Sequence, residues 1–273
     1  MKYFGFLARF VVIPLLILRF LIWRDRKRGK DLPEHLQSWP EDAVLLAHVI
    51  TAVTYTTPWD NYLVASKVWW YDPDLVTGKT IGWVPIEEYS FFVLQTLMTG
   101  SWMQYLARRV ETPEAEGQHT YPAARLVATA ALATLWAKSM QGLVSGDDAD
   151  RYRNLILGWA LPPIMLQVGF GGDILWRHRK LIASSILPAT AYLGATDSLA
   201  IGSGTWTINP EKTTETEVIN NLPFEELLFF FVTNVLLVFG VTLVQAKESE
   251  KRLPDALKAP YEQFKKRWID KQS

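Results

Sequence analysis

Residues Gly82-Trp83-Val84-Pro85-Ile86-Glu87-Glu88 open an apolar stretch that continues through Phe91 and Phe92. A second segment, Asn221-Leu222-Pro223-Phe224-Glu225-Glu226, opens a similar stretch through Phe229 and Phe230. Carboxyl groups at the mouth of a membrane-length helix are costly to desolvate. Because this arrangement occurs in two halves of one chain, it favours a functional site over two ordinary helix starts, at which proline and acidic residues are also common.

Apolar stretches recur along the whole chain of 273 residues. About 20 such residues are needed to cross the hydrocarbon core of a membrane. The pattern predicts an all-α integral membrane protein with seven transmembrane helices, the second being the shortest and richest in threonine. The predicted spans are Tyr3–Trp23, Ala43–Trp59, Val84–Leu106, Ala123–Val144, Leu155–Trp176, Leu181–Ile201 and Leu222–Gln245.

Basic residues alternate between the two sets of connections. Fourteen lie in residues 24–30, 108–109, 177–180 and 247–258, and six lie in the opposite set. An excess of Lys and Arg marks the cytoplasmic side. The sequence therefore predicts a multi-pass protein of the cell membrane with its N-terminus outside and its C-terminus in the cytoplasm. The first stretch is predicted to be a retained helix, because it is too long for a secretory signal and ends in a basic cluster.

The two halves of the chain repeat each other beyond the glutamates. Residues 21–27 resemble residues 174–180, and these Trp-Arg segments are interpreted as topology anchors. Asp60 precedes Glu87 by 27 residues, and Asp197 precedes Glu225 by 28. We expect two parallel three-helix repeats, 1–110 and 151–246, joined by a linking helix in 111–150 and followed by a cytoplasmic tail, 247–273. Parallel repeats can build a site at their interface, and both sets of carboxyl groups would lie on its outer side.

Paired glutamates in an apolar site suit proton transfer. An apolar environment and a neighbouring like charge favour the neutral form of a carboxyl group, so one member of a pair is expected to stay protonated. Such an acid can protonate an electron-rich carbon–carbon double bond, and a neighbouring carboxylate can remove a proton from the resulting cation. Aromatic faces stabilise a cation in a dry site. The candidates are Phe91, Phe92, Phe229, Phe230, Trp70 and Trp83.

The doubled Pro-x-Glu-Glu before Phe-Phe, together with Pro58-Trp59-Asp60 and Thr196-Asp197, resembles the lycopene cyclase family of the heterodimer-derived, fused type. The same domain also occurs joined to phytoene synthase. The resemblance covers nearly the whole chain. It implies an isomerase, a lycopene β-cyclase of carotenoid biosynthesis that closes the ψ-ends of lycopene to β-rings without net redox change. By the same resemblance the acid/base residues are Glu87, Glu88, Glu225 and Glu226, supported by Asp60 and Asp197.

The resemblance implies lycopene as a lipophilic polyene substrate, with membrane lipid and other carotenoid enzymes as further partners. Nucleic acid is not expected, because 28 basic residues balance 28 acidic ones. No flavin or dinucleotide is expected, since the sequence contains no GxGxxG, and no metal is expected. The absence of cysteine excludes disulfides and thiol nucleophiles.

Three other functions can be compared with this one. An ion-coupled transporter with an acidic site between the repeats is the main alternative, and ion-dependent uptake without pigment change would favour it. An intramembrane protease of the EExxxR type lacks its arginine here, and a retinal photoreceptor lacks a lysine in the last span. His48, the only histidine in a span, is interpreted as a helix-contact residue. The ring type, the number of ends cyclised and the division between acid and base stay open.

Overall fold

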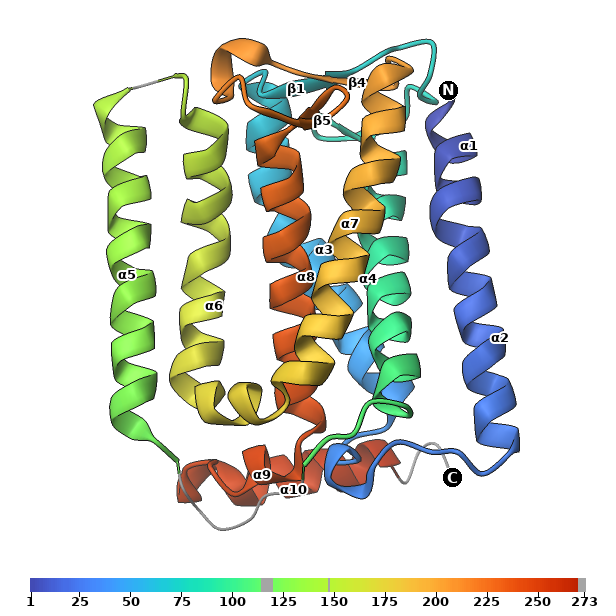
Figure 1. Cartoon of the computed structure of the whole chain (residues 1–273), viewed down its shortest axis with the longest axis vertical. Coiled ribbons are helices and arrows are strands. Elements are labelled where there is room, and N and C mark those ends of the chain that lie inside the picture. The colour runs from blue at the N-terminus through green and yellow to red at the C-terminus, as the bar shows by residue number, and fades with distance from the viewer. Residues whose placement is uncertain (114–119, 147, 270–273) are drawn as a thin grey trace.

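The computed structural model describes residues 1–113, 120–146 and 148–269. Parts of the predicted linking segment (114–119 and 147) and of the predicted tail (270–273) lie outside the described residues. Long helices run side by side between two ends of the molecule (Figure 1). The long helices are α1–α2 (Tyr3–Leu7 and Ile13–Lys27, continuous through a π-helical turn at Ala8–Val12), α3 (Glu41–Ala65), α4 (Ile86–Ala107), α5 (Pro122–Ser145), α6 (Arg151–Arg177), α7 (Arg179–Gly202) and α8 (Phe224–Gln245).

Each of the seven predicted stretches coincides with one long helix. The largest difference is in α3, which continues to Ala65 although the apolar run ends near Trp59. Pro58 lies inside this helix without ending it. The side-chain amide of Asn61 donates to the carbonyl of Thr57, one turn earlier in the same helix, at 2.9 Å.

Three helices of the described chain are long and apolar enough to cross a membrane: Tyr3–Lys27, α6 and α8. Large apolar side chains also lie exposed along the outer faces of the bundle. They include Leu16, Ile17, Phe20, Ile50, Leu126, Val127, Leu166 and Leu187. Water-soluble monomers rarely expose such a continuous apolar surface. These features indicate association with a membrane.

The centre of the bundle is formed by α4 and α8, which pack against each other and against α3 and α7. A buried polar network crosses this contact. The Asn234 side-chain oxygen accepts hydrogen bonds from Gln95 and Thr99, each at 3.1 Å, and its nitrogen donates to Thr190 at 3.1 Å. Buried polar groups are costly when unpaired, so this network favours one register of the three helices.

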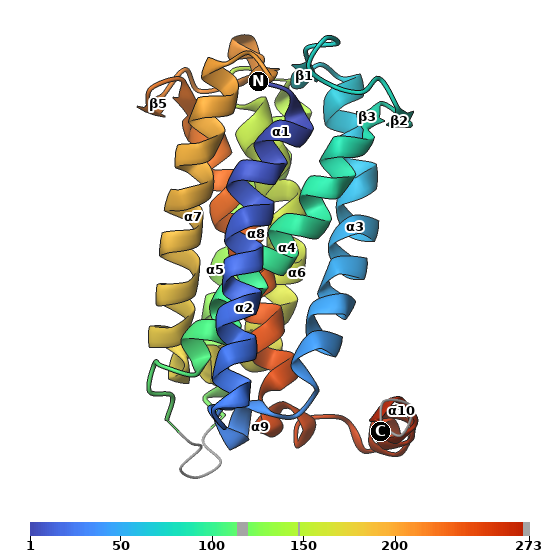
Figure 2. The same cartoon turned by 90° about the vertical axis from the view of Figure 1, so that its right-hand side faces the viewer.

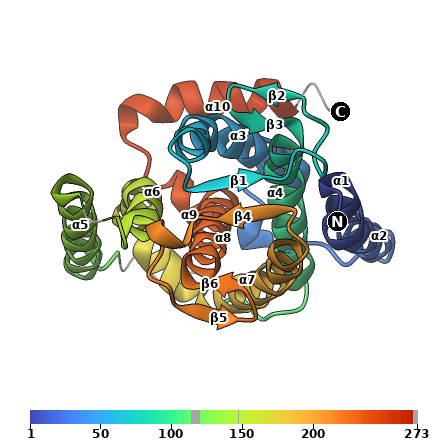
Figure 3. The same cartoon turned by 90° about the horizontal axis from the view of Figure 1, so that it is seen from above.

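Short strands gather at the end of the molecule that carries the N-terminus (Figure 1). Strand β1 (Trp69–Tyr71) follows α3, β4 (Trp206–Ile208) follows α7, and the two pair antiparallel with Trp70 opposite Thr207. Seen from above, this pair lies between α3 and α4 on one side and α7 and α8 on the other (Figure 3). The strands therefore cover the mouth of the central helices.

A small hairpin precedes each of the two glutamate-bearing helices. Strands β2 (Thr80–Ile81) and β3 (Val84–Pro85) lead into α4, and β5 (Glu217–Ile219) and β6 (Leu222–Pro223) lead into α8. The turn of the first hairpin contains Gly82 at φ +66°, and that of the second contains Asn221 at φ +64°. These are residues that tolerate the left-handed region.

The opposite end carries the basic connections, the short helix α9 (Lys247–Glu250) and the helix α10 (Asp255–Ile269), which lies across the bundle beside the end of α3 (Figure 2). Ion pairs join the helix ends there. They link Arg108 to Glu41, Arg109 to Asp25, Arg177 to Glu248 and Arg252 to Asp173. The sequence-predicted basic clusters thus lie at one end of the molecule.

Candidate active site

The two Pro-x-Glu-Glu segments occupy equivalent places at the hairpin–helix junctions. Pro85 and Pro223 are extended, with φ and ψ near −68° and 151° and near −60° and 146°, and each is the residue before the first helical turn. The glutamates then fall in the first turn of α4 and α8, where the helix dipole favours negative charge. Since neighbouring helix residues point about 100° apart, the two members of each pair face different surroundings.

Glu87 and Glu225 turn toward the loops that precede their helices. The backbone N–H of Thr77 donates to Glu87 Oε1 at 2.6 Å, and that of Thr214 donates to Glu225 Oε1 at 2.8 Å. Both side chains are buried, at 1% and 0% exposure. Neither residue lines the cavity of about 40 Å³ that lies among the central helices. These two glutamates hold the loops against the helices.

Glu88 and Glu226 face inward and are held by phenol groups. Tyr3 donates to Glu88 Oε2 at 2.6 Å, and Tyr71 donates to the same oxygen at 3.0 Å. Tyr152 donates to Glu226 Oε1 at 2.7 Å. Burial, reinforced by Glu88, raises the pKa of Tyr71 well above its ordinary value, so this phenol stays a neutral donor.

Asp60 and Asp197 lie near the ends of α3 and α7 and are 1% and 2% exposed. Their hydrogen bonding differs. Asp197 Oδ1 accepts from the Trp206 ring nitrogen at 3.1 Å, whereas neither buried oxygen of Asp60 has a hydrogen-bond partner among the described residues. The ring nitrogen of Trp69 donates to Tyr71 at 3.0 Å instead. The two halves of the site are therefore similar in composition and unequal in hydrogen bonding.

A small cavity of about 40 Å³ brings four carboxyl groups together. Asp60, Glu88, Asp197 and Glu226 all line it. The remaining lining residues are Tyr3, Phe6, Trp59, Trp69, Tyr71, Phe91, Phe92, Tyr152, Leu193, Thr196, Trp206, Ile208, Phe229 and Phe230. Strands β1 and β4 contribute Trp69 and Trp206 to its lining, so the paired strands cover one side of the cavity.

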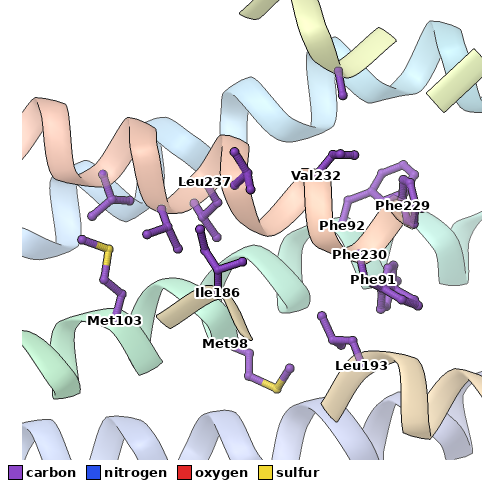
Figure 4. Packing of buried hydrophobic residues seen from close by; sticks show 14 of the residues in the cluster. Phe91, Phe92, Met98, Met103, Ile186, Leu193, Phe229, Phe230, Val232 and Leu237 are labelled. Carbon is purple, nitrogen blue, oxygen red and sulfur yellow. The ribbon is translucent and has the colours of Figure 1, made fainter. Parts of the chain in front are cut away.

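Four phenylalanine rings, Phe91, Phe92, Phe229 and Phe230, line the cavity and lie close together in the core (Figure 4). Phe91 and Phe230 meet edge to face with ring centroids 6.3 Å apart, and Phe229 and Phe230 are 5.5 Å apart. Trp59 stacks on Phe229 at 5.7 Å. Aromatic faces thus adjoin the acidic groups, as the sequence predicted for the phenylalanines.

Trp70 and Trp83 are placed differently from the phenylalanines. Their side chains are 43% and 67% exposed, and neither lines the cavity. His48 also lies away from the carboxyl groups. One ring nitrogen of His48 is 2.7 Å from the carbonyl oxygen of Val44, one turn earlier in α3, as expected for a helix-contact residue.

Sequence reasoning did not single out Tyr3, Tyr71 and Tyr152. A signal for two of them was present, because Lys2-Tyr3 and Arg151-Tyr152 open the first helix of each predicted repeat. No comparable signal in the sequence marks Tyr71. Within residues 1–113, 120–146 and 148–269, no three or more His, Asp or Glu side chains are arranged so that they could hold a metal ion together. The expectation of no cofactor stays a prediction.

Fold and site together define a helical, membrane-associated protein with a cavity lined by four carboxyl groups and by aromatic rings. The sequence matches the family described as lycopene cyclase over residues 41–106 and 155–244, which include all six predicted acidic residues. This chain belongs to the lycopene cyclase family.

Named relatives extend this match over most of the chain. A lycopene beta-cyclase of Halobacterium salinarum is 38% identical over 246 residues, covering 89% of this chain and 95% of the relative. A bifunctional lycopene cyclase/phytoene synthase of Sporisorium reilianum is 36% identical over 203 residues, covering 72% of this chain and 29% of the relative. The similarly named protein of Blakeslea trispora is 33% identical over 207 residues, covering 74% and 33%. No solved structure matches.

Proposed function

We propose that this protein is a lycopene β-cyclase, an isomerase that closes the ψ-end groups of lycopene to β-rings by carboxyl acid/base catalysis. The observation that carries this proposal is the convergence of four carboxyl groups on one cavity bounded by phenylalanine and tryptophan rings. Family membership supplies the substrate class, and the 38% identical archaeal relative supports the β-ring.

The reaction needs one proton donor and one proton acceptor. A carboxylic acid adds a proton to the terminal carbon–carbon double bond of the polyene. The π electrons of a second double bond attack the resulting cation, which forms the ring carbon–carbon bond and moves the positive charge into the ring. A carboxylate then removes a proton from a neighbouring ring carbon and leaves a new double bond. One proton enters and one leaves, so the product is an isomer of the substrate.

Hydrogen bonding suggests different roles for the acidic groups. A buried carboxylate without any donor is costly, so Asp60 is best suited to carry the proton that starts the reaction. Glu88 accepts two phenol hydrogen bonds, which stabilise the ionised form, and is therefore assigned as the base. Glu226 and Asp197, with one donor each, hold negative charge beside the cation.

Glu87 and Glu225 act as positioning residues in this scheme. Each accepts a backbone hydrogen bond from the loop before its helix and so sets the direction of the next glutamate. A role in direct proton transfer would require these side chains to leave the loop. The doubled motif thus combines one structural and one chemical glutamate in each copy.

The aromatic boundary suits a carbocation intermediate. Phe91, Phe92, Phe229 and Phe230 present ring faces and edges to the cavity, and ring faces attract positive charge. The covering strands limit access of water, which would otherwise trap the cation as an alcohol. An ion-coupled transporter needs a path for water and ions to its site, and the closed aromatic cover argues against that alternative.

A seven-span arrangement in the cell membrane is part of the proposal, with two parallel repeats, the N-terminus outside and the C-terminus in the cytoplasm. The matched contacts of the two halves support it. Glu88 pairs with Tyr3 as Glu226 pairs with Tyr152, and β1 pairs with β4 about a midpoint at Trp70 and Thr207. The basic connections at the α9–α10 end support the orientation. Membrane lipid and other carotenoid enzymes are the expected partners.

Coexpression in a lycopene-accumulating bacterium tests the function. Pigment extracts are expected to contain yellow-orange cyclic carotenes in place of red lycopene. Glu88→Gln and Glu226→Gln should abolish this change while the protein stays in the membrane. Glu211→Gln, an exposed glutamate outside the cavity, is the matched control and should cyclise normally. Unchanged red pigment with the unmodified protein present in the membrane contradicts the proposal.

A further inference from the structure

A second cavity, of about 190 Å³, lies between α3, α4, α6 and α8 and adjoins the acid-lined cavity. The two cavities share Phe91, Phe92, Phe229 and Phe230, which lie between them. The other residues that line the second cavity are His48, Thr51, Ala52, Tyr55, Thr56, Gln95, Thr96, Trp159, Pro163, Gln167, Thr233, Leu236 and Leu237. Within the part of the chain that the structure describes, these four rings are the side chains that line both cavities.

The walls of the second cavity suit an apolar, elongated occupant. No Asp, Glu, Lys or Arg lines it. Several of its polar side chains bond within the protein: Thr233 donates to the Phe229 carbonyl at 2.9 Å, and Gln167 donates to the Leu236 carbonyl at 2.8 Å. The cavity therefore presents mainly methyl, methylene and ring surface, which is a poor environment for an ion and a good one for a hydrocarbon.

The end of the second cavity farthest from the phenylalanine rings is closed where His48 and Gln167 approach Gly240 of α8. A Cβ atom on Gly240 would lie 2.4 Å from His48 Nε2 and 3.3 Å from the Gln167 side-chain nitrogen. His48 and Gln167 both line the cavity, so this contact forms its floor. Along α8 the distance from Glu226 to Leu237 is about 16 Å at 1.5 Å per residue. A hydrocarbon ligand that reaches from this floor to the carboxyl groups is therefore extended.

The cavity reaches the outer surface between α3 and α6. Thr51 and Tyr55 line it and are also exposed, Tyr55 to 42%. Above this opening the two helices are bridged by side chains: Tyr55 donates to the Trp159 carbonyl at 2.8 Å, and Trp59 donates to the Leu155 carbonyl at 3.1 Å. The surface around the opening carries exposed apolar side chains, such as Ile50 and Leu166. An opening in this position faces lipid.

We infer that the second cavity binds the polyene chain of the substrate, which enters laterally from the membrane between α3 and α6. The end group to be cyclised passes between the four phenylalanine rings into the acid-lined cavity. The path of about 16 Å along α8 from the floor to the carboxyl groups is shorter than an extended C40 polyene, so the rest of the molecule extends through the lateral opening into lipid. One end is therefore cyclised at a time, and a second ring requires release and re-entry. This inference rests on the proposed function.

The chain contains no cysteine, which makes it a clean background for single-cysteine labelling. Ala52→Cys places a thiol in the second cavity, and Thr54→Cys places one on the exposed face of the same helix as the matched control. Both variants are labelled in detergent with a small methanethiosulfonate, with and without lycopene. At ten times the dissociation constant, lycopene should slow labelling of the Ala52→Cys variant about tenfold and leave the Thr54→Cys variant unchanged. Equal labelling rates with and without lycopene in both variants overturn the inference.

A steric test uses the same two positions. Ala52→Trp fills the cavity and should lower cyclisation roughly 5- to 100-fold, whereas Thr54→Trp on the outer face should have little effect. Normal cyclisation by the Ala52→Trp variant overturns the inference. If the unmodified protein forms no cyclic carotene, the proposed function fails, and the labelling experiment still decides whether the second cavity binds a polyene.

Discussion

Asp60 and Asp197 occupy matching positions in the two halves of the chain, yet we expect their replacement by asparagine to have unequal effects. Asparagine has nearly the size of aspartate, so neither change creates a cavity. Asp60→Asn removes the only group of the acid-lined cavity that has no hydrogen-bond donor on either oxygen, which is the group assigned to start the reaction. Asp197→Asn keeps an oxygen that can accept from the Trp206 ring nitrogen.

The expected magnitudes follow from these contacts. Loss of a general acid lowers a rate by about 100- to 10,000-fold, which corresponds to roughly 3 to 5 kcal/mol in the activation barrier. At Asp197 the charge-assisted hydrogen bond from Trp206 becomes a neutral one, a loss of about 1 kcal/mol. That loss corresponds to a rate reduced roughly fivefold to tenfold. The cyclisation rate of the Asp60→Asn variant should therefore be at least ten times lower than that of the Asp197→Asn variant.

The assay is the initial rate of cyclic carotene formation in membranes that contain equal amounts of each variant, measured by chromatography of extracted pigments. Protein amount is normalised by immunoblot, which separates loss of chemistry from loss of protein. Equal effects of the two substitutions would refute the assignment of Asp60 as the proton donor, as would a larger effect at Asp197. The double variant shows whether the two groups act independently.

Three further outcomes are expected. Tyr152→Phe removes the phenol donor of Glu226 and should lower cyclisation roughly 10- to 100-fold at an unchanged protein level. Gly82→Ala should displace Asn61, whose side-chain oxygen would lie 2.1 Å from the new Cβ, and lower both thermal stability and activity. Burial, together with His35 and Arg177, lowers the pKa of His178 from its ordinary value to about 4. The folded protein keeps this ring neutral, whereas the unfolded chain protonates it below pH 6.5. The free energy of unfolding therefore has its full value above pH 6.5 and falls as the pH drops toward 4. By pH 5 the loss is about 2 kcal/mol. Thermal unfolding in detergent at pH 7.5 and pH 5 measures this loss, and the His178→Gln variant should lack it.

The positions of the helices could be predicted from the local pattern of apolar residues. Each predicted apolar stretch coincides with a long helix, because a run of about 20 apolar residues is a strong signal that needs no knowledge of neighbours. Helix ends were harder to predict, as α3 illustrates: the helix continues beyond Trp59 through the polar pair Asp60-Asn61 to Ala65, and a hydropathy pattern does not record this. The strands β1 and β4 were not predicted, because three-residue segments pair only when two distant helices bring them together.

The six acidic residues were found from composition and spacing, and four of them line one cavity. Their division into roles depended on the folded arrangement. Glu87 and Glu88 are adjacent and chemically identical, so no local signal separates the one that holds Thr77 from the one that accepts from Tyr3.

The amino-acid sequence thus specifies the helices, the doubled carboxyl motif and the chemistry that such groups can perform, since these follow from side-chain type and local period. Packing specifies which carboxyl group faces the cavity and which tyrosine donates to it. The physical reason is geometric. Neighbouring side chains on a helix point about 100° apart. Tyr152 and Glu226 are 74 residues apart in the sequence and meet only when the chain between them folds back on itself.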